Sequence, residues 1–147
     1  MLVPANAQGN VLYCEDGLSF WGGVDPKTGI IIDAHHPNHG ASLAGHIVLM
    51  PTSRGSCSGS GVLLELARNG SAPAALVFRE AEDILTLGAM IAAQLFDRSV
   101  AVLRLPAELF STLSNAEHAT IRNHTLVFTG QSIALEERNA EALNLTN

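Results

Sequence analysis

Residues 47–61 read IVLMPTSRGSCSGSG. The apolar run at 47–50 predicts a buried strand, and the serines and glycines after it predict a tight turn that enters a helix near Ser58. Apolar residues continue at helical spacing through 62–68, and Gly70 predicts the end of the helix. We therefore expect a strand, a polar turn and a helix in direct succession.

The second half of the chain repeats this pattern of apolar strand and helix. Short apolar strands are expected at 75–78, 100–103 and 125–128, with helices over 83–96 and 106–115. Strands that are apolar throughout are typical of a parallel sheet covered on both faces. We therefore predict a βαβαβ arrangement for this half.

The first half shows a different pattern, in which short β-type runs alternate with glycine-rich turns. The runs lie at 11–13, 18–21 and 30–32, and turn residues cluster at 25–29 and 37–40. Such alternation is typical of a β-meander or a small barrel. The predicted fold class is therefore α/β, with a small β-barrel-like sheet joined to βαβ units.

The length of the chain predicts a single domain over 1–147. The chain has 147 residues, and its sequence contains no internal repeat, low-complexity tract or linker. The tail at 131–147 is polar, and we expect it either to be loose or to dock on a partner.

Charge and composition exclude several classes of function. Charged residues make up 15% of the chain, and the net charge is -6 with Lys27 as the single lysine. Because basic residues do not cluster, neither nucleic acid nor an anionic membrane surface is expected as a partner. A surface so poor in charge suggests contact with another protein. With no signal-like N-terminus and no apolar run of the roughly 20 residues that a membrane span needs, a cytoplasmic protein is expected.

The cysteines do not form a metal-binding pattern. The chain has 2 of them, Cys14 and Cys57, and they do not form a CxxC pair. Two cysteines alone hold neither an iron–sulfur cluster nor a structural zinc ion, so no metal bound by this chain is predicted. Cys57 stands where a helix dipole can activate a thiol, but packing in the turn is the role we expect for it.

The serine-rich turn is a candidate anion site. It places hydroxyls and backbone N–H groups at a helix N-terminus, where the macrodipole is positive, and Arg54 adds a charge. The turn matches neither a Walker loop nor a dinucleotide fingerprint. A serine in this field would bind a carboxylate or phosphate, or act as a base; the alternative is that the hydroxyls only cap the helix. The predicted substrate-binding residues are Arg54, Gly55, Cys57, Ser58 and Ser60.

Several motifs in a fixed order resemble the small subunit of aconitase X. They are LSFWGGVDP at 18–26, TG at 28–29, ID at 32–33, HP at 36–37 with Gly40, RGS at 54–56, GS at 59–60, LE at 64–65 and GSAPAA at 70–75. The resemblance extends from about residue 8 to residue 130 and so covers most of the chain.

This resemblance implies a swivelling β/β/α domain that closes over a large subunit carrying an iron–sulfur cluster. It also implies a heterodimer in which this chain by itself binds no cofactor. Enzymes of the family are hydro-lyases: bacterial members dehydrate cis-3-hydroxy-L-proline to Δ1-pyrroline-2-carboxylate, and archaeal members dehydrate mevalonate 5-phosphate. The chain is thus expected to be a dehydratase subunit that is inactive alone.

The same resemblance implies a role for each residue of the turn. Ser56, which follows Gly55, is the catalytic base that removes the proton α to the substrate carboxylate, while the partner's iron acts on the departing hydroxyl. Arg54 and the N–H groups after Gly55 hold the carboxylate. Cys57 and Gly61 stand where serine and an aromatic residue are more usual in the family, and Cys57 removes a hydroxyl beside the base.

Histidines gather in the loop before residue 47. Asp33, His36 and His39 are candidates for lining the cleft, with His35 and His46 nearby. Their spacing matches no zinc pattern, so hydrogen bonding, loop packing or a subunit contact is the role we expect. Phosphotransfer through a histidine is a further alternative. In the motif at 18–26, the Phe20 and Trp21 rings are expected in the core or an interface.

Three classes of function remain open on the sequence. They are a dehydratase subunit, an autonomous anion-binding module, and a phosphocarrier or scaffold. Between the two substrates, cis-3-hydroxy-L-proline is preferred, because Arg54 and Lys27 are the cations of residues 1–57 and a phosphate in addition to a carboxylate would need more. The alternative is the small subunit of a mevalonate 5-phosphate dehydratase.

Overall fold

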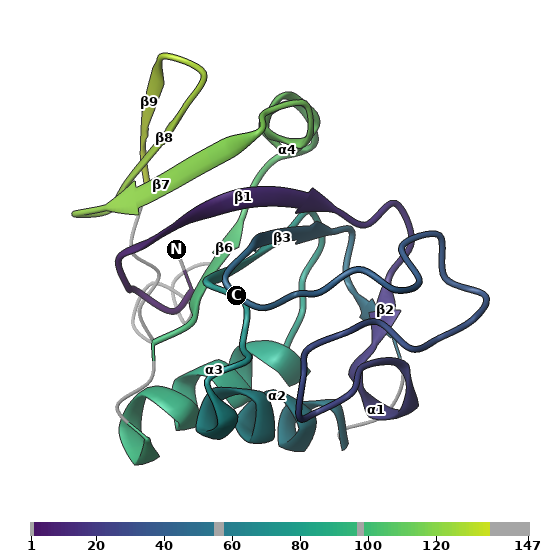
Figure 1. The fold of residues 1–147 in the computed structure, drawn as a ribbon. Coiled ribbons are helices and arrows are strands. Elements are labelled where there is room, and N and C mark those ends of the chain that lie inside the picture. The colour runs from purple at the N-terminus through teal and green to yellow at the C-terminus, as the bar shows by residue number, and fades with distance from the viewer. Residues whose placement is uncertain (1, 55–57, 97–98, 136–147) are drawn as a thin grey trace.

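A computed structural model describes residues 2–54, 58–96 and 99–135. Its largest element is a curled seven-stranded sheet in the order β6-β5-β3-β1-β7-β8-β9. In the view of Figure 1, helices lie below this sheet and another helix lies above it, beside the end of the sheet that curls upward through β7, β8 and β9. The strands are β1 (Ala7–Tyr13), β3 (Ile47–Met50), β5 (Ala75–Phe78), β6 (Ala101–Arg104), β7 (His118–Arg122), β8 (Thr125–Phe128) and β9 (Gln131–Ala134), and a separate two-stranded sheet pairs β2 (Leu18–Ser19) with β4 (Ser53–Arg54). The helices are α1 (Phe20–Gly23), α2 (Ser58–Asn69), α3 (Ile84–Leu95) and α4 (Ala107–Ser114).

The βαβ prediction is confirmed for the middle of the chain. Strands β3, β5 and β6 run parallel, and α2 and α3 form the crossovers between them. Every residue of β3 and β5 is buried, which is the pattern that the uniformly apolar sequence predicts. Helix α2 begins at Ser58 as expected, and the bounds of α3 and α4 agree with the prediction to within one residue.

Two parts of the predicted pairing are wrong. Residues 125–128 form β8, which lies antiparallel between β7 and β9 and is therefore not a third parallel strand. Residues 11–13 belong to β1, which pairs parallel with β3, so the first half does not form a meander. A parallel pair needs a crossover between its strands, and residues 14–46 supply it. In that crossover 30–32 makes only isolated bridges.

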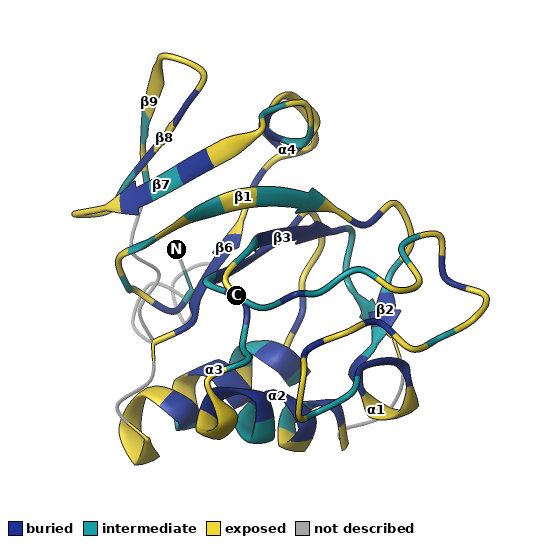
Figure 2. Ribbon diagram, viewed as in Figure 1, coloured by how far each residue is buried: buried dark blue, intermediate teal, exposed yellow. Residues whose placement is uncertain are grey.

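The sheet separates two apolar cores, one on each face. Val48, Leu76 and Val102 point to the face covered by α2 and α3, whereas Leu49, Val77 and Leu103 point to the face covered by α4 and the β7–β9 strands. Figure 2 shows the buried faces of α2 and α3 turned to the sheet and their outer faces exposed. The α/β class with a barrel-like sheet is thereby confirmed. The layer of buried parallel strands stops at the carboxyl ends of β3, β5 and β6.

Residues 131–134 of the polar tail pair with β8 as strand β9. Residues 136–147 of that tail lie outside the described residues. Within the described ranges, no helix is both long enough and apolar enough to cross a membrane.

Candidate active site at the carboxyl ends of the parallel strands

The candidate site begins where β3 ends. Pro51 and Thr52 follow this strand, and Ser53 and Arg54 then form β4 beside Leu18 and Ser19 of β2. Helix α2 begins at Ser58. In open α/β sheets, ligands bind beyond the carboxyl ends of the strands, so the turn occupies the edge where a site is expected.

The structure describes only part of the predicted turn. Gly55, Ser56 and Cys57 lie outside the described residues, and their predicted roles stay predictions. Arg54 is exposed on one side of this gap, and Ser58 is exposed at the start of α2 on the other side. Ser60 is half-buried one turn into the helix. A cation and a helix N-terminus therefore flank the segment that carries the candidate base.

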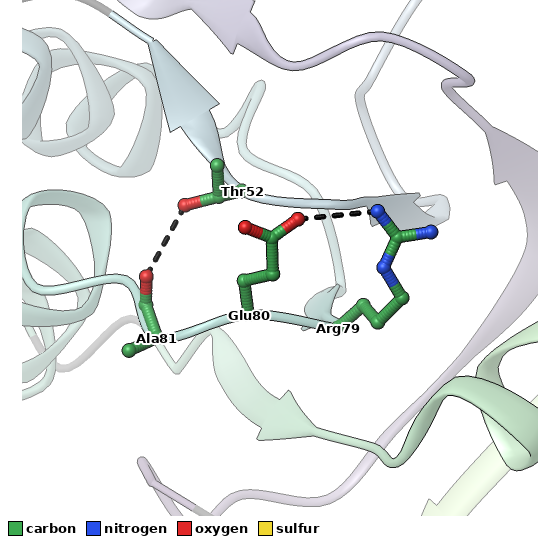
Figure 3. Close-up of polar contacts among 4 residues, drawn as sticks. All are labelled: Thr52, Arg79, Glu80 and Ala81. Atoms are coloured by element: carbon green, nitrogen blue, oxygen red, sulfur yellow. Dashed lines mark hydrogen bonds and ion pairs between the residues drawn. The ribbon is translucent and has the colours of Figure 1, made fainter.

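A second loop braces the approach to this turn. The Pro51 carbonyl accepts hydrogen bonds from the backbone N–H groups of Arg79 and Glu80, at 3.2 and 2.9 Å. The Thr52 hydroxyl donates to the Ala81 carbonyl at 3.2 Å, while the Arg79 side chain turns to Glu80 at 3.1 Å (Figure 3). The loop after β5 thus runs beside the segment that leads from β3 to the turn.

Glu82 extends this brace into the protein interior. Its side chain is buried, and it accepts a hydrogen bond from the Ser53 hydroxyl. It also accepts from the backbone N–H groups of Leu85, at 2.9 and 3.0 Å, and Thr86, at 3.1 Å, which begin helix α3. One carboxyl group therefore connects the residue before Arg54 to the N-terminus of a helix.

Sequence reasoning missed this role of Glu82. The sequence indicates only an acidic residue near the positive end of a helix dipole, which is a common arrangement. The sequence signal for this capping is the position of Glu82, which precedes by three residues Leu85, the donor of the capping N–H group. No local signal points to Ser53, which precedes Glu82 by 29 positions.

Gly17 allows β2 to approach the turn closely. A Cβ atom at this position would lie 2.7 Å from the Thr52 carbonyl oxygen and 3.1 Å from Cγ of Arg54. Any side chain here would therefore push β2 away from β4. The close approach brings the segment that contains Asp16 against the Arg54 side of the site.

Of the candidate cleft residues, His36 contacts this segment. His36 is buried, its Nε2 atom lies 3.2 Å from the Asp16 carbonyl oxygen, and its Nδ1 atom accepts the Asn38 N–H group at 3.0 Å. Because Nδ1 is an acceptor, the proton is on Nε2, which donates to Asp16. Asp33 accepts the His35 N–H group at 3.0 Å within its own turn. His39 is exposed.

The described residues do not form a metal site. Among them, no group of three or more histidine, cysteine, aspartate and glutamate side chains is arranged to hold an ion. Cys14 is fully buried, and burial raises the pKa of its thiol from 9.0 to about 12. An iron–sulfur cluster therefore does not fit the part of the chain that the structure describes.

These features define a class of protein: an α/β domain in which an arginine and a helix N-terminus flank a turn at the carboxyl ends of the parallel strands. The chain belongs to the aconitase X swivel-domain family, whose model matches residues 1–129. Its similarity to cis-3-hydroxy-L-proline dehydratase of Pseudomonas aeruginosa is 46% identity over 97% of this chain and 24% of that protein. The phosphomevalonate dehydratase small subunit of Pyrococcus abyssi is 50% identical over 57% of this chain and 65% of that subunit.

A solved structure has the same fold. The crystal structure of Thermococcus kodakaraensis aconitase X, in its holo-form, matches 92% of this chain and 94% of the compared chain, with a TM-score of 0.67 and 33% identity. The chain thus spans about a quarter of the length of the Pseudomonas relative and about two thirds of the Pyrococcus small subunit.

Proposed function

We propose that this chain is the small subunit of an aconitase X-type hydro-lyase that dehydrates cis-3-hydroxy-L-proline to Δ1-pyrroline-2-carboxylate. The observation that carries the proposal is the 46% identity to a dehydratase of that substrate, which extends over 97% of the chain. The matches to phosphomevalonate dehydratase small subunits cover less of the chain, 57% for the Pyrococcus protein. The enzyme is completed by a large subunit, consistent with the naming of those relatives.

Ser56 is the base in this proposal. It removes the proton from the carbon next to the substrate carboxylate, and the electron pair of that C–H bond forms the double bond as the 3-hydroxyl departs with a proton as water. The resulting enamine tautomerises to the pyrroline. The Arg54 charge and the positive end of α2, which flank Ser56 in sequence, favour its deprotonated form and attract the carboxylate.

The large subunit holds the iron–sulfur cluster in this proposal, as the resemblance to the aconitase X family implies. When bound there, the cluster would supply a Lewis acid for the leaving hydroxyl. The contribution of this chain is then to bind the carboxylate, to accept the proton, and to exclude water when it closes over the large subunit.

The test is turnover by the complex of this chain with its large subunit. We expect dehydration of cis-3-hydroxy-L-proline in preference to mevalonate 5-phosphate, and no turnover by either subunit alone. Ser56→Ala should lower kcat by about a hundredfold or more, which is the usual contribution of a positioned base. Ser132→Ala, at an exposed position in β9, is the matched control and should leave kcat unchanged.

Three results would contradict the proposal in different ways. Near-normal turnover by Ser56→Ala would remove the base assignment alone. Preferred turnover of mevalonate 5-phosphate would support the alternative substrate. The sequence identity between this chain and the Pyrococcus phosphomevalonate dehydratase small subunit is consistent with that alternative. An isolated chain that binds phosphate or a carboxylate tightly and needs no large subunit would favour the anion-binding module.

A further inference from the structure

Glu82 caps helix α3 from the position before the N-cap. The N-cap residue of this helix is Asp83, but its side chain makes no capping hydrogen bond. The carboxyl group of Glu82 accepts the N–H groups of Leu85 and Thr86 instead. Because aspartate is among the residues that cap helices best, the need for a cap does not by itself explain why the longer side chain takes this role.

The length of the Glu82 side chain allows a second contact, which a helix cap does not need. Its Oε2 atom accepts the Leu85 N–H group at 3.0 Å and also accepts a hydrogen bond from the Ser53 hydroxyl. The side chain is 5% exposed, and burying a carboxylate is costly unless hydrogen bonds compensate for the loss of water. These donors and the positive end of α3 supply that compensation, so one buried group holds both the helix and Ser53.

The contact with Ser53 is the last of an ordered series. Strands β3 and β5 pair in parallel along their whole length. Beyond the strands, residues 51–53 continue this arrangement with hydrogen bonds to residues 79–82, taken in order along both segments, and Figure 3 shows the one between Thr52 and Ala81. The series ends at Ser53, one residue before Arg54.

Ser53 is held through its backbone as well as through its side chain. It is the register partner of Leu18 in the β2–β4 pair, and Leu18 is fully buried. Arg54 follows directly and is exposed. The exposed arginine therefore extends from a residue that is fastened to β2 on the one hand and to Glu82 on the other.

We propose that Glu82 is a positioning residue for the dehydratase reaction, which acts through its hydrogen bond to Ser53 and sets the position from which Arg54 reaches the substrate carboxylate. This inference rests on the proposed function, in which Arg54 attracts that carboxylate. Glu82 is buried and acts only through Ser53. Since a displacement of about 1 Å in a positioning group can cost a hundredfold in rate, loss of this one bond should be measurable in the kinetics.

Ser53→Ala is the deciding variant, because it removes the contact with Glu82 and leaves the cap of α3 in place. In the complex with the large subunit, we expect kcat/KM to fall by about tenfold, mainly through a higher KM. Ser53→Thr keeps the hydroxyl group and should retain most of kcat/KM. A loss as large for Ser53→Thr as for Ser53→Ala would contradict the role of the hydrogen bond.

Variants of Glu82 test whether Ser53 acts through this carboxyl group. Glu82→Gln retains an oxygen that can accept the N–H groups of α3 and an amide that can bond to the Ser53 hydroxyl, so it should keep most of kcat/KM. Glu82→Ala should lower kcat/KM, and adding Ser53→Ala to it should lower kcat/KM no further. Additive losses would overturn the proposal, and if Glu82→Ala does not fold, the two Ser53 variants decide.

Ser71→Ala is the matched control. Ser71 is half-buried, as Ser53 is, and its hydroxyl donates to a residue distant in sequence, the Lys27 carbonyl, at 2.9 Å. It follows the C-terminal end of α2, whereas the candidate turn precedes the N-terminal end. Ser71→Ala should leave kcat/KM unchanged. Near-normal kcat/KM for Ser53→Ala, or equal losses for Ser53→Ala and Ser71→Ala, would overturn the positioning role.

Amide hydrogen exchange on the isolated chain separates this inference from the proposed function. Ser53→Ala should speed exchange at residues 52–54 and leave exchange in α4 unchanged. Faster exchange at 52–54, in a protein whose unmodified complex has no dehydratase activity, would contradict the proposed reaction and support Glu82 as the group that fixes β4. An active complex in which Ser53→Ala changes neither exchange nor kcat/KM would overturn the positioning role and leave the proposed function standing.

Discussion

Two neighbouring regions of this protein reach order by different means. Between residues 47 and 104, the described residues form regular strands and helices, of which β3 and β5 are buried throughout. Residues 14–46 contain a two-residue strand and a four-residue kinked helix, and backbone hydrogen bonds between turns hold the remainder. The difference teaches that a regular hydrogen-bonding pattern orders the sheet, whereas individual hydrogen bonds order the crossover and shape the surface around Arg54. Substitutions in the two regions should therefore act through different physical effects.

The largest expected effect is a cavity in the regular region. Leu76 in β5 is fully buried, and Leu76→Ala should lower the free energy of unfolding by about 2–5 kcal/mol. Denaturant titration of the chain measures this change. Ile32→Ala in the crossover, where the side chain is 49% exposed, is the control and should change stability by less than about 1 kcal/mol. Equal losses for the two variants would contradict the comparison.

The crossover should be most sensitive at its glycines. Gly29 has φ of +77°, and a Cβ atom there would lie 2.7 Å from the Ser71 carbonyl oxygen. Gly29→Ala should therefore lower the free energy of unfolding by roughly 2–3 kcal/mol, from backbone strain and overlap together.

Gly40→Ala separates these two causes. Gly40 has φ of +90°, but a Cβ atom there would meet no other atom within 4 Å. Its substitution should introduce strain alone, at roughly 1 kcal/mol. If thermal or denaturant unfolding shows the same loss for Gly29→Ala and Gly40→Ala, the close contact with Ser71 is not important for stability.

The same comparison explains how far the sequence predicts the structure. Strand 75–78 and the helix from Ser58 are predicted correctly because burial imposes a local pattern of apolar residues. The direction of 125–128 is not predicted, because an apolar run does not encode which neighbour it pairs with. The crossover is not predicted because its hydrogen bonds are individual, such as the one from Ile32 to Gly23.

The candidate site shows the same limit. Arg54 and the start of α2 follow from a local motif, and the structure places both at the carboxyl edge of β3. The bond between Ser53 and Glu82 joins residues 29 positions apart, so no local pattern contains it. Trp21 is recognised as a residue of the core or an interface, and only the fold shows that its side chain is outside the core.

Cys14 joins the two regions and should make the stability of the chain sensitive to alkaline pH. Its N–H group donates to the Leu49 carbonyl at 2.7 Å, and burial raises the pKa of its thiol from 9.0 to about 12. The unfolded chain therefore loses this proton before the folded chain does, so stability is unaffected below pH 9 and falls as the pH rises from there toward 12. The slope should be at most about 1.4 kcal/mol per pH unit.

The Cys14→Ala variant lacks this pH dependence of stability and serves as the reference protein for the measurement. We expect the difference in unfolding free energy between the two proteins to be constant at neutral pH and to narrow above pH 9. A difference that stays constant to pH 11 would show that the Cys14 thiol ionises equally in both states.

The smallest expected effect is a gain in stability within the regular region. Gly61 is an exposed glycine in α2, and a Cβ atom there would meet nothing within 4 Å. Gly61→Ala should therefore raise the free energy of unfolding by about 0.5–1 kcal/mol, because alanine restricts the unfolded chain and favours the helix. Gly88→Ala in α3 is the matched control, since its Cβ would lie 3.0 Å from the Ser60 carbonyl oxygen. If both helices are held by packing, only Gly88→Ala should destabilise the chain, whereas a loss for Gly61→Ala would mean that the start of α2 needs a flexible backbone.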